Sequence, residues 1–154
     1  MKTKTPPQRL PERRRATFPI ISVGDFGRDH WSTLAYIECI NVDGSGTPAL
    51  ERMRCNPNRH PGLAEGRRGP RTEWQTSWSS HTKAGILITG HDDFDCVNDL
   101  EKAGLITVHG TGISPVYHLT TDGWRVVGIL RQHKAGGKKY GDFVYPERRE
   151  AVLA

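Results

Sequence analysis

The sequence has no long apolar run, and hydrophobic and aromatic residues are few. Of its 154 residues, 35% are hydrophobic and 8% are aromatic. No stretch approaches the roughly 20 apolar residues that a membrane-spanning helix needs. The first 20 residues also lack the apolar core of a secretory signal. We therefore expect no membrane partner and a cytoplasmic location.

Cysteines are scarce and odd in number, and the common catalytic motifs are missing. Cys39, Cys55 and Cys96 cannot all pair within one chain, so we expect reduced thiols or metal ligands, as in a cytosol. The sequence has no phosphate-binding loop, no dinucleotide-binding glycine motif and no nucleophile elbow. We therefore assign no catalytic residues and expect that the protein is not an enzyme.

Positive charge is in moderate excess and unevenly placed. The net charge is +5, with 22 Lys and Arg against 17 Asp and Glu. Residues 1–15 and 52–71 each hold six basic residues against one acidic residue. Such runs are often solvated, but arginine suits phosphate better than lysine does because its planar guanidinium presents a fork of donors. The predicted nucleic-acid-binding residues are Arg9, Arg13, Arg14, Arg15, Arg52, Arg54, Arg59, Arg67, Arg68, Arg71, Arg125, Lys138 and Lys139.

The first half of the chain predicts a basic arm, one clear helix and a long irregular segment. Residues 1–22 are rich in proline and charge and have little to pack. A helix over 29–40, capped by Asp29, would bury a stripe of apolar residues. A short helix is expected in 47–55, and a strand in 84–89. Between them, residues 56–83 form an insertion without periodicity.

The second half predicts a helix, a hairpin and a further helix. Asp92 or Asp93 would cap a helix over 93–103, which Gly104 would end. Strands over 105–109 and 116–120 would pair across a loose loop. Thr121 would cap the last helix of a domain covering 23–134, and residues 135–154 would form a tail. The core-facing residues of that last helix are expected to be Trp124, Val127 and Leu130.

The stretch VNDLEKAGLI…VYHLTTDGWRVVGIL resembles winged helix-turn-helix proteins of the MarR, PadR and ArsR kind over residues 92–131. The resemblance implies an α+β fold: a winged-helix-like core of three to four helices with a small antiparallel hairpin or sheet. It also implies DNA reading by the helix over 93–103. The phrases DHWSTLAYIE, RMRCNPNRHP and GHDDFDC are similar to small phage and prophage proteins. The matching residues are Leu100, Glu101, Gly104, Leu105, Ile106, Tyr117, Leu119, Thr120 and Gly123.

The expected reader helix departs from that pattern because it is acidic. Reading base edges takes Arg, Lys, Asn, Gln, Ser or Thr, and here only Asn98 and Lys102 qualify. From Ala103 to Trp124 there is no Lys or Arg, so the wing offers no cation to phosphate. We therefore expect the helix to serve packing, a protein partner or self-association, as in a homodimer. The predicted partner-binding residues are Asp92, Asp95, Asp99 and Glu101.

Two motifs with mirrored spacing form a candidate metal site. Cys55-x4-His60 and His91-x4-Cys96 together offer the two thiolates and two imidazoles of a structural zinc site. Ordinary packing of Cys96 in a helix is the alternative. His91 with the neighbouring acids, Asp92, Asp93 and Asp95, could instead hold a hard cation for phosphodiester chemistry.

Three functional hypotheses follow. The first is a small nucleic-acid-associated regulatory or accessory protein of phage or mobile-element type, which binds DNA through its basic arm and arginine-rich loop. The second is a protein-interaction module, or an inhibitor of a host complex, that uses the acidic helix. The third is a metal-dependent nuclease.

Overall fold

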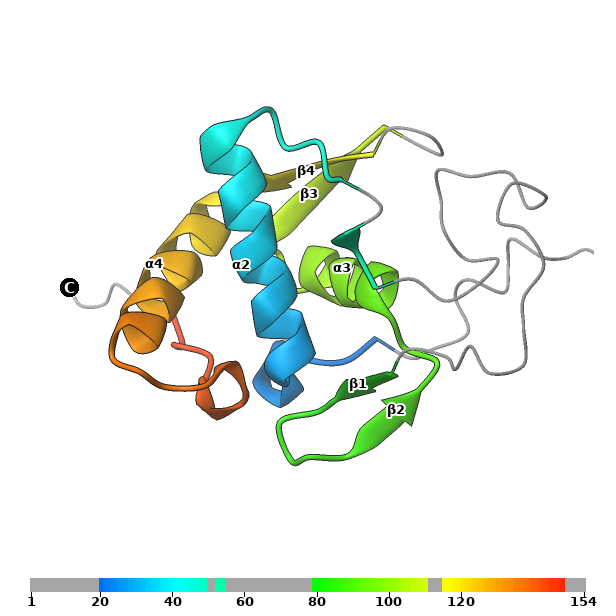
Figure 1. Ribbon diagram of the computed structural model, residues 1–154, viewed down its shortest axis with the longest axis vertical. Helices are drawn as coiled ribbons and strands as arrows, with labels where there is room; N and C mark the ends of the chain where they lie inside the picture. The colour runs from blue at the N-terminus through cyan, green and yellow to red at the C-terminus, as the bar shows by residue number, and fades with distance from the viewer. Residues whose placement is uncertain (1–19, 50–51, 55–78, 111–114, 149–154) are drawn as a thin grey trace, which may run out of the picture.

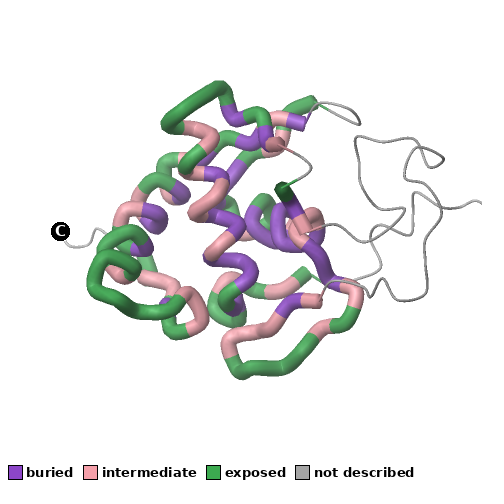
Figure 2. Tube along the Cα trace, in the orientation of Figure 1, coloured by how far each residue is buried: buried purple, intermediate pink, exposed green. Residues whose placement is uncertain are grey.

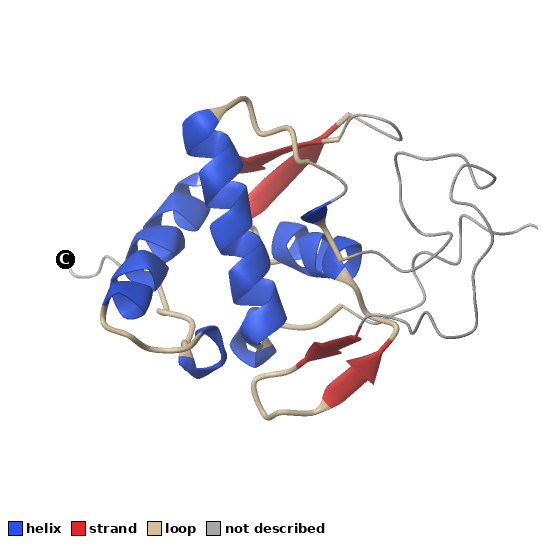
Figure 3. Cartoon of the chain, in the orientation of Figure 1, coloured by secondary structure: helices blue, strands red, loops and turns tan. Residues whose placement is uncertain are grey.

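A computed structural model describes residues 20–49, 52–54, 79–110 and 115–148. Three helices and two small antiparallel hairpins make up this part of the chain, so the fold is α+β, as expected (Figures 1 and 3). The expectations for the arm, for most of the insertion and for Cys55 and His60 lie outside these residues. The elements are η1 Val23–Asp25, α2 Arg28–Asp43, β1 Ser79–His81, β2 Leu87–Thr89, α3 Asp93–Lys102, β3 Ile106–His109, β4 Val116–Leu119, α4 Thr121–Ala135 and η4 Tyr140–Asp142.

The helix α2 lies at the centre of the fold, and both other helices pack against it (Figure 1). The hairpin β3–β4 also contacts α2, and β1 lies near its first turn. Buried residues follow the inner faces of the three helices and α3 most of all (Figure 2). None of the described helices is both long and apolar enough to cross a membrane.

The residue that caps α2 is not the predicted Asp29. The helix begins after Gly27, while Asp29 lies in its first turn. The carboxylate of Asp29 instead accepts a hydrogen bond of 3.0 Å from the backbone N–H of His81, which joins α2 to β1. Gly27 is needed at this junction because a Cβ there would collide with the carbonyl of His81. The predicted apolar stripe of Trp31, Leu34, Ile37 and Ile40 is confirmed for its first three residues, which are buried, while Ile40 is half-buried against the core.

Both predicted ends of α3 are confirmed. The carboxylate of Asp92 accepts from the backbone N–H groups of Phe94 and Asp95, at 3.0 and 3.2 Å. The carboxylate of Asp95 accepts in return from the N–H of Asp92 at 3.0 Å, so the two acids form a reciprocal capping box. Gly104 follows the helix with a φ of +80°, a left-handed conformation that favours glycine.

The predicted hairpin and last helix are present, with two differences at the helix. The strands β3 and β4 pair antiparallel, with Val108 opposite Tyr117. The cap of α4 is Thr120, whose hydroxyl accepts from the N–H of Gly123 at 3.0 Å, and not Thr121. Trp124 is 43% exposed and does not face the core, whereas Val126 does.

Two further expectations for the first half are corrected. The residues Thr47, Pro48 and Ala49 are not helical, so the short helix does not begin where Pro48 suggested. The expected irregular insertion over 56–83 contains β1 at its end, because Ser79–His81 pairs with Leu87–Thr89. Strands of three residues are too short to give a readable alternation of polar and apolar positions.

Candidate functional site

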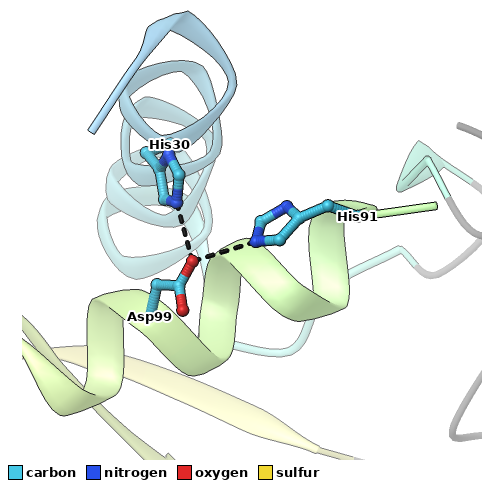
Figure 4. A group of neighbouring side chains, drawn as sticks. All are labelled: His30, His91 and Asp99. Carbon is cyan, nitrogen blue, oxygen red and sulfur yellow. Dashed lines mark hydrogen bonds and ion pairs between the residues drawn. The ribbon is translucent and has the colours of Figure 1, made fainter. Parts of the chain in front are cut away.

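Two histidines and an aspartate meet in the interior between α2 and α3 (Figure 4). The Nε2 atoms of His30 and His91 lie 2.8 and 3.0 Å from the same carboxylate oxygen, Oδ2 of Asp99. Both histidines are 0% exposed and Asp99 is 2% exposed. Among the described residues, this is the group whose ligand atoms converge closely enough to hold a metal ion, since all lie within 4.8 Å of one another.

Local structure brings each of the three side chains to this point. His30 lies in the first turn of α2, four residues before the buried Leu34, on the face that packs against α3. His91 directly precedes Asp92, the cap of α3, while Asp99 lies in the last turns of that helix. The capping of α3 by Asp92 therefore also fixes where His91 approaches Asp99.

A serine and a cysteine extend the cluster on the far side of His91. The Ser80 hydroxyl lies 2.9 Å from Nδ1 of His91 and donates to the His91 carbonyl at 2.9 Å. Cys96 Sγ is 3.7 Å from the Ser80 oxygen and 3.9 Å from Nδ1 of His91. Serine, histidine and aspartate in this order resemble a hydrolytic triad, but the hydroxyl is buried beyond the reach of a substrate.

Burial and hydrogen bonding set the charges in the cluster. Burial favours the protonated form of Asp99, but the hydrogen bonds from His30 and His91 outweigh it and lower the pKa of this carboxyl below its usual 3.8. Burial also lowers the pKa of His30 below 6.5, against the opposing effect of Asp99. Burial raises the pKa of the Cys96 thiol well above 9.0. The cluster thus contains an ionised aspartate, a neutral His30 and a neutral thiol.

The second nitrogen of His30 and the second oxygen of Asp99 have backbone partners. Nδ1 of His30 accepts from the N–H of Gly27 at 3.4 Å, so the ring proton is on Nε2 and points at Asp99. Oδ1 of Asp99 accepts from the N–H of Ile21 at 3.3 Å. Asp99 therefore holds together the segment before η1, the helix α2 and the turn before α3.

The structure corrects the prediction that α3 displays its acids to a partner. Asp92, Asp95 and Asp99 are buried, the first two as caps and the third under two imidazoles. Only Glu101, of the four predicted partner-binding acids, is exposed. Composition alone could not distinguish these cases, because acids on a helix are usually solvated.

Two of the predicted nucleic-acid-binding arginines are used within the fold. Arg54 Nε lies 2.7 Å from Asp93 Oδ1, and its Nη1 donates to the carbonyl of Ser79 at 2.8 Å. Arg125 Nε donates to Asp122 at 2.7 Å, and its Nη1 donates to the Pro146 carbonyl at 2.7 Å. These contacts correct the expectation that both guanidinium groups are directed at phosphate.

The other predicted nucleic-acid-binding residues are either exposed or outside the described residues. Arg52, Lys138 and Lys139 are exposed. The remaining predicted arginines lie outside the described residues and are Arg9, Arg13, Arg14, Arg15, Arg59, Arg67, Arg68 and Arg71.

The structure also bears on the two predicted metal sites, the zinc site and the hard-cation site. Cys55 and His60 lie outside the described residues, while His91 and Cys96 are neighbours in the interior. The hard-cation set does not converge, because Asp92 and Asp95 cap α3 and Asp93 pairs with Arg54. His30 and Ser80 were missed. For His30 a signal existed, since its spacing from Leu34 and Ile37 matches the buried stripe of α2.

Comparison of the chain with protein-family models, with curated proteins and with solved structures finds no match.

Proposed function

We propose that this is a small nucleic-acid-associated regulatory or accessory protein that contacts phosphate through surfaces other than α3. The supporting observation is that Asp92, Asp95 and Asp99 are buried, while exposed lysines lie beyond the end of α4. The first expected hypothesis is thus retained, with Arg54 and Arg125 removed from the contact set.

The helix α3 is unsuited to reading bases because packing uses most of its surface. Five of its ten residues are buried: Asp95, Cys96, Val97, Asp99 and Leu100. Its exposed residues are Glu101 and Lys102, at the C-terminal end. A groove-reading helix needs a row of donors and acceptors on one free face, and α3 has no such row.

The cations suited to phosphate contact lie elsewhere. Basic and acidic residues nearly balance in the part of the chain that the structure describes, so the excess behind the net charge of +5 falls in other segments. Within the described part, Lys138 and Lys139 extend the basic end of α4, where Lys134 is also exposed and Arg131 is exposed but paired with Glu38 at 2.9 Å. Contacts of this kind neutralise phosphates without reading sequence.

The test is binding of the full chain to a fluorescent random-sequence duplex as salt is raised. Log affinity should fall linearly with log salt, by about 0.9 for each phosphate contact made. The double variant Lys138→Glu/Lys139→Glu and the triple variant Arg13→Ala/Arg14→Ala/Arg15→Ala should each weaken binding and flatten this slope. Lys102→Glu, an exposed charge change of the same kind at the end of α3, is the matched control and should leave both unchanged.

A lack of binding by the wild-type protein at low ionic strength would refute the proposal. If the Lys102→Glu control lost as much duplex affinity as the other variants, α3 would instead be in contact with the nucleic acid. Docking of a partner on Asp92, Asp95 and Asp99 is no longer proposed, since these carboxylates are buried.

A further inference from the structure

We propose that His30, His91 and Asp99 form a structural zinc site, in which Nε2 of each histidine and Oδ2 of the aspartate bind the ion. This ligand set differs from the thiolate set that the sequence suggested, and it shares only His91 with it. The proposal is independent of nucleic-acid binding, because none of the three side chains reaches the surface.

The distances suit a metal ion of this size. Zinc binds histidine nitrogen and carboxylate oxygen at ~2.1 Å, so two ligands of a tetrahedral site lie ~3.4 Å apart. The two Nε2 atoms are 2.8 and 3.0 Å from Oδ2 of Asp99, and all three ligand atoms lie within 4.8 Å of one another. Small rotations of the side chains would therefore open the cluster around an ion, with a water molecule as the fourth ligand.

The hydrogen bonds of Ser80 are compatible with a positive centre beside His91. A serine hydroxyl has one hydrogen, and here it is donated to the His91 carbonyl, which can only accept. With that donation, Nδ1 of His91, 2.9 Å from the same hydroxyl oxygen, carries its own hydrogen. A neutral His91 in this tautomer presents a lone pair on Nε2, 3.0 Å from a carboxylate oxygen that also only accepts. A metal ion between these atoms would bind both of them. The alternatives that the experiment distinguishes are a second imidazole proton and the other tautomer, in which Nε2 donates to Asp99 and Ser80 donates to Nδ1.

The surroundings of His91 match the support that metal-binding histidines usually have. Such a histidine donates its other ring N–H to an oxygen, which fixes the tautomer and aims the ligating nitrogen. Ser80 is that acceptor here, and it is held in turn by the His91 backbone. At His30, metal binding would move the ring proton to Nδ1, and the hydrogen bond lost is the long one of 3.4 Å from Gly27.

The chemistry of the ligands favours zinc and a structural role. Two imidazoles with one carboxylate suit zinc better than calcium or magnesium, which prefer oxygen ligands. The three ligands are shielded from solvent, so no open position faces a substrate. The ion would join α2 to the turn before α3, and its binding would add to the stability of the fold.

The experiment uses the full-length protein, stripped with EDTA, dialysed and titrated with Zn²⁺ and separately with Co²⁺. We expect one equivalent of tightly bound metal by elemental analysis and a raised midpoint of thermal unfolding. Bound Co²⁺ should give the visible absorption of a four-coordinate site without a thiolate-to-cobalt charge-transfer band. The variants His30→Gln and Asp99→Asn should lose the metal, while His109→Gln, an exposed histidine of the β3–β4 hairpin, should retain it.

Two variants guard against loss of folding as the explanation. Ser80→Ala should remain folded by circular dichroism but bind zinc about 10- to 100-fold more weakly, as expected when the partner of a ligating histidine is removed. Cys96→Ser should bind zinc normally. Absence of stoichiometric metal in the wild-type protein would overturn the proposal and leave a proton beside His91. A thiolate band, or loss of metal in Cys96→Ser, would overturn this ligand set.

Discussion

His30 in the first turn of α2 and Asp99 near the end of α3 form a buried hydrogen bond of 2.8 Å across 69 residues of sequence. Nε2 of His91 lies 3.0 Å from the same oxygen. A single carboxylate therefore connects the helices α2 and α3 with the turn between β2 and α3. Its loss would leave the buried ring N–H of His30 and the Nε2 atom of His91 with poorer partners, which is costly in an interior.

Asp99→Asn should destabilise the protein by about 2–4 kcal/mol in the presence of EDTA, because the amide is uncharged and, with its oxygen toward the two histidines, turns its NH2 group toward the Ile21 N–H. The measurement is urea unfolding followed by circular dichroism. Glu101→Gln, an exposed change on the same helix, is the control and should change stability by less than about 0.5 kcal/mol. Similar effects of the two substitutions would contradict the buried role of Asp99.

The two described cysteines should differ sharply in reactivity. In a Cys55→Ser background, Cys39, which is exposed, should react readily with a thiol reagent at pH 8. Cys96 should react only on unfolding, because burial blocks access and raises its pKa well above 9.0, which leaves little thiolate at this pH. Raising the pH from 7 to 9 should therefore hardly accelerate its labelling, as followed by peptide mass mapping. Rapid labelling of Cys96 in folded protein would contradict this placement.

Two glycines of α4 provide a matched pair. A Cβ at Gly123 would collide with the carbonyl of Leu105, so Gly123→Ala should destabilise by about 1–3 kcal/mol. At Gly128 the nearest atom is a flexible Arg131 nitrogen at 3.7 Å, so Gly128→Ala should stabilise by about 0.5–1 kcal/mol through helix propensity. Thermal unfolding of both variants checks the difference in sign, and a Gly123→Ala variant as stable as the wild type would refute the close approach.

Arg54 should affect stability and not nucleic-acid affinity. Lysine cannot reproduce the guanidinium contacts with both Asp93 and the Ser79 carbonyl, so Arg54→Lys should cost about 1–2 kcal/mol. The salt dependence of duplex binding should remain that of the wild type at a temperature where both proteins are folded. A flatter salt slope in Arg54→Lys would return this residue to the proposed contact surface.

The elements that the sequence predicts well are those with local signals. The cap Asp92 and the terminal Gly104 bracket α3 within a dozen residues, and the strands β3 and β4 are separated by only six residues of sequence. At α4 the spacing of three residues from Trp124 to Val127 and Leu130 predicts Trp124 as an inner residue. The buried face instead includes Gly123, which lies against the Leu105 carbonyl, and Val126, so Trp124 lies outside that face.

The site itself could be predicted only in part, because its partners are distant in sequence. The spacing of His91 from Cys96 predicts a metal site shared by these two residues, yet Nε2 of His91 faces Asp99, which also contacts His30. Whether an acid on α3 faces solvent or an imidazole depends on the packing of α2 against α3. That packing is set by long-range contacts that periodicity does not report.

The hydrogen bond from the Ile21 amide to Asp99 allows the buried cluster to be followed by hydrogen exchange at a residue near the start of the described chain. Because this N–H donates to a carboxylate that the two imidazoles also contact, it exchanges with deuterium when the segment before η1 leaves Asp99. Exchange at Ile21 as slow as that of the amides inside α2 and α3 would show that this segment opens together with the two helices, although the residue itself belongs to neither.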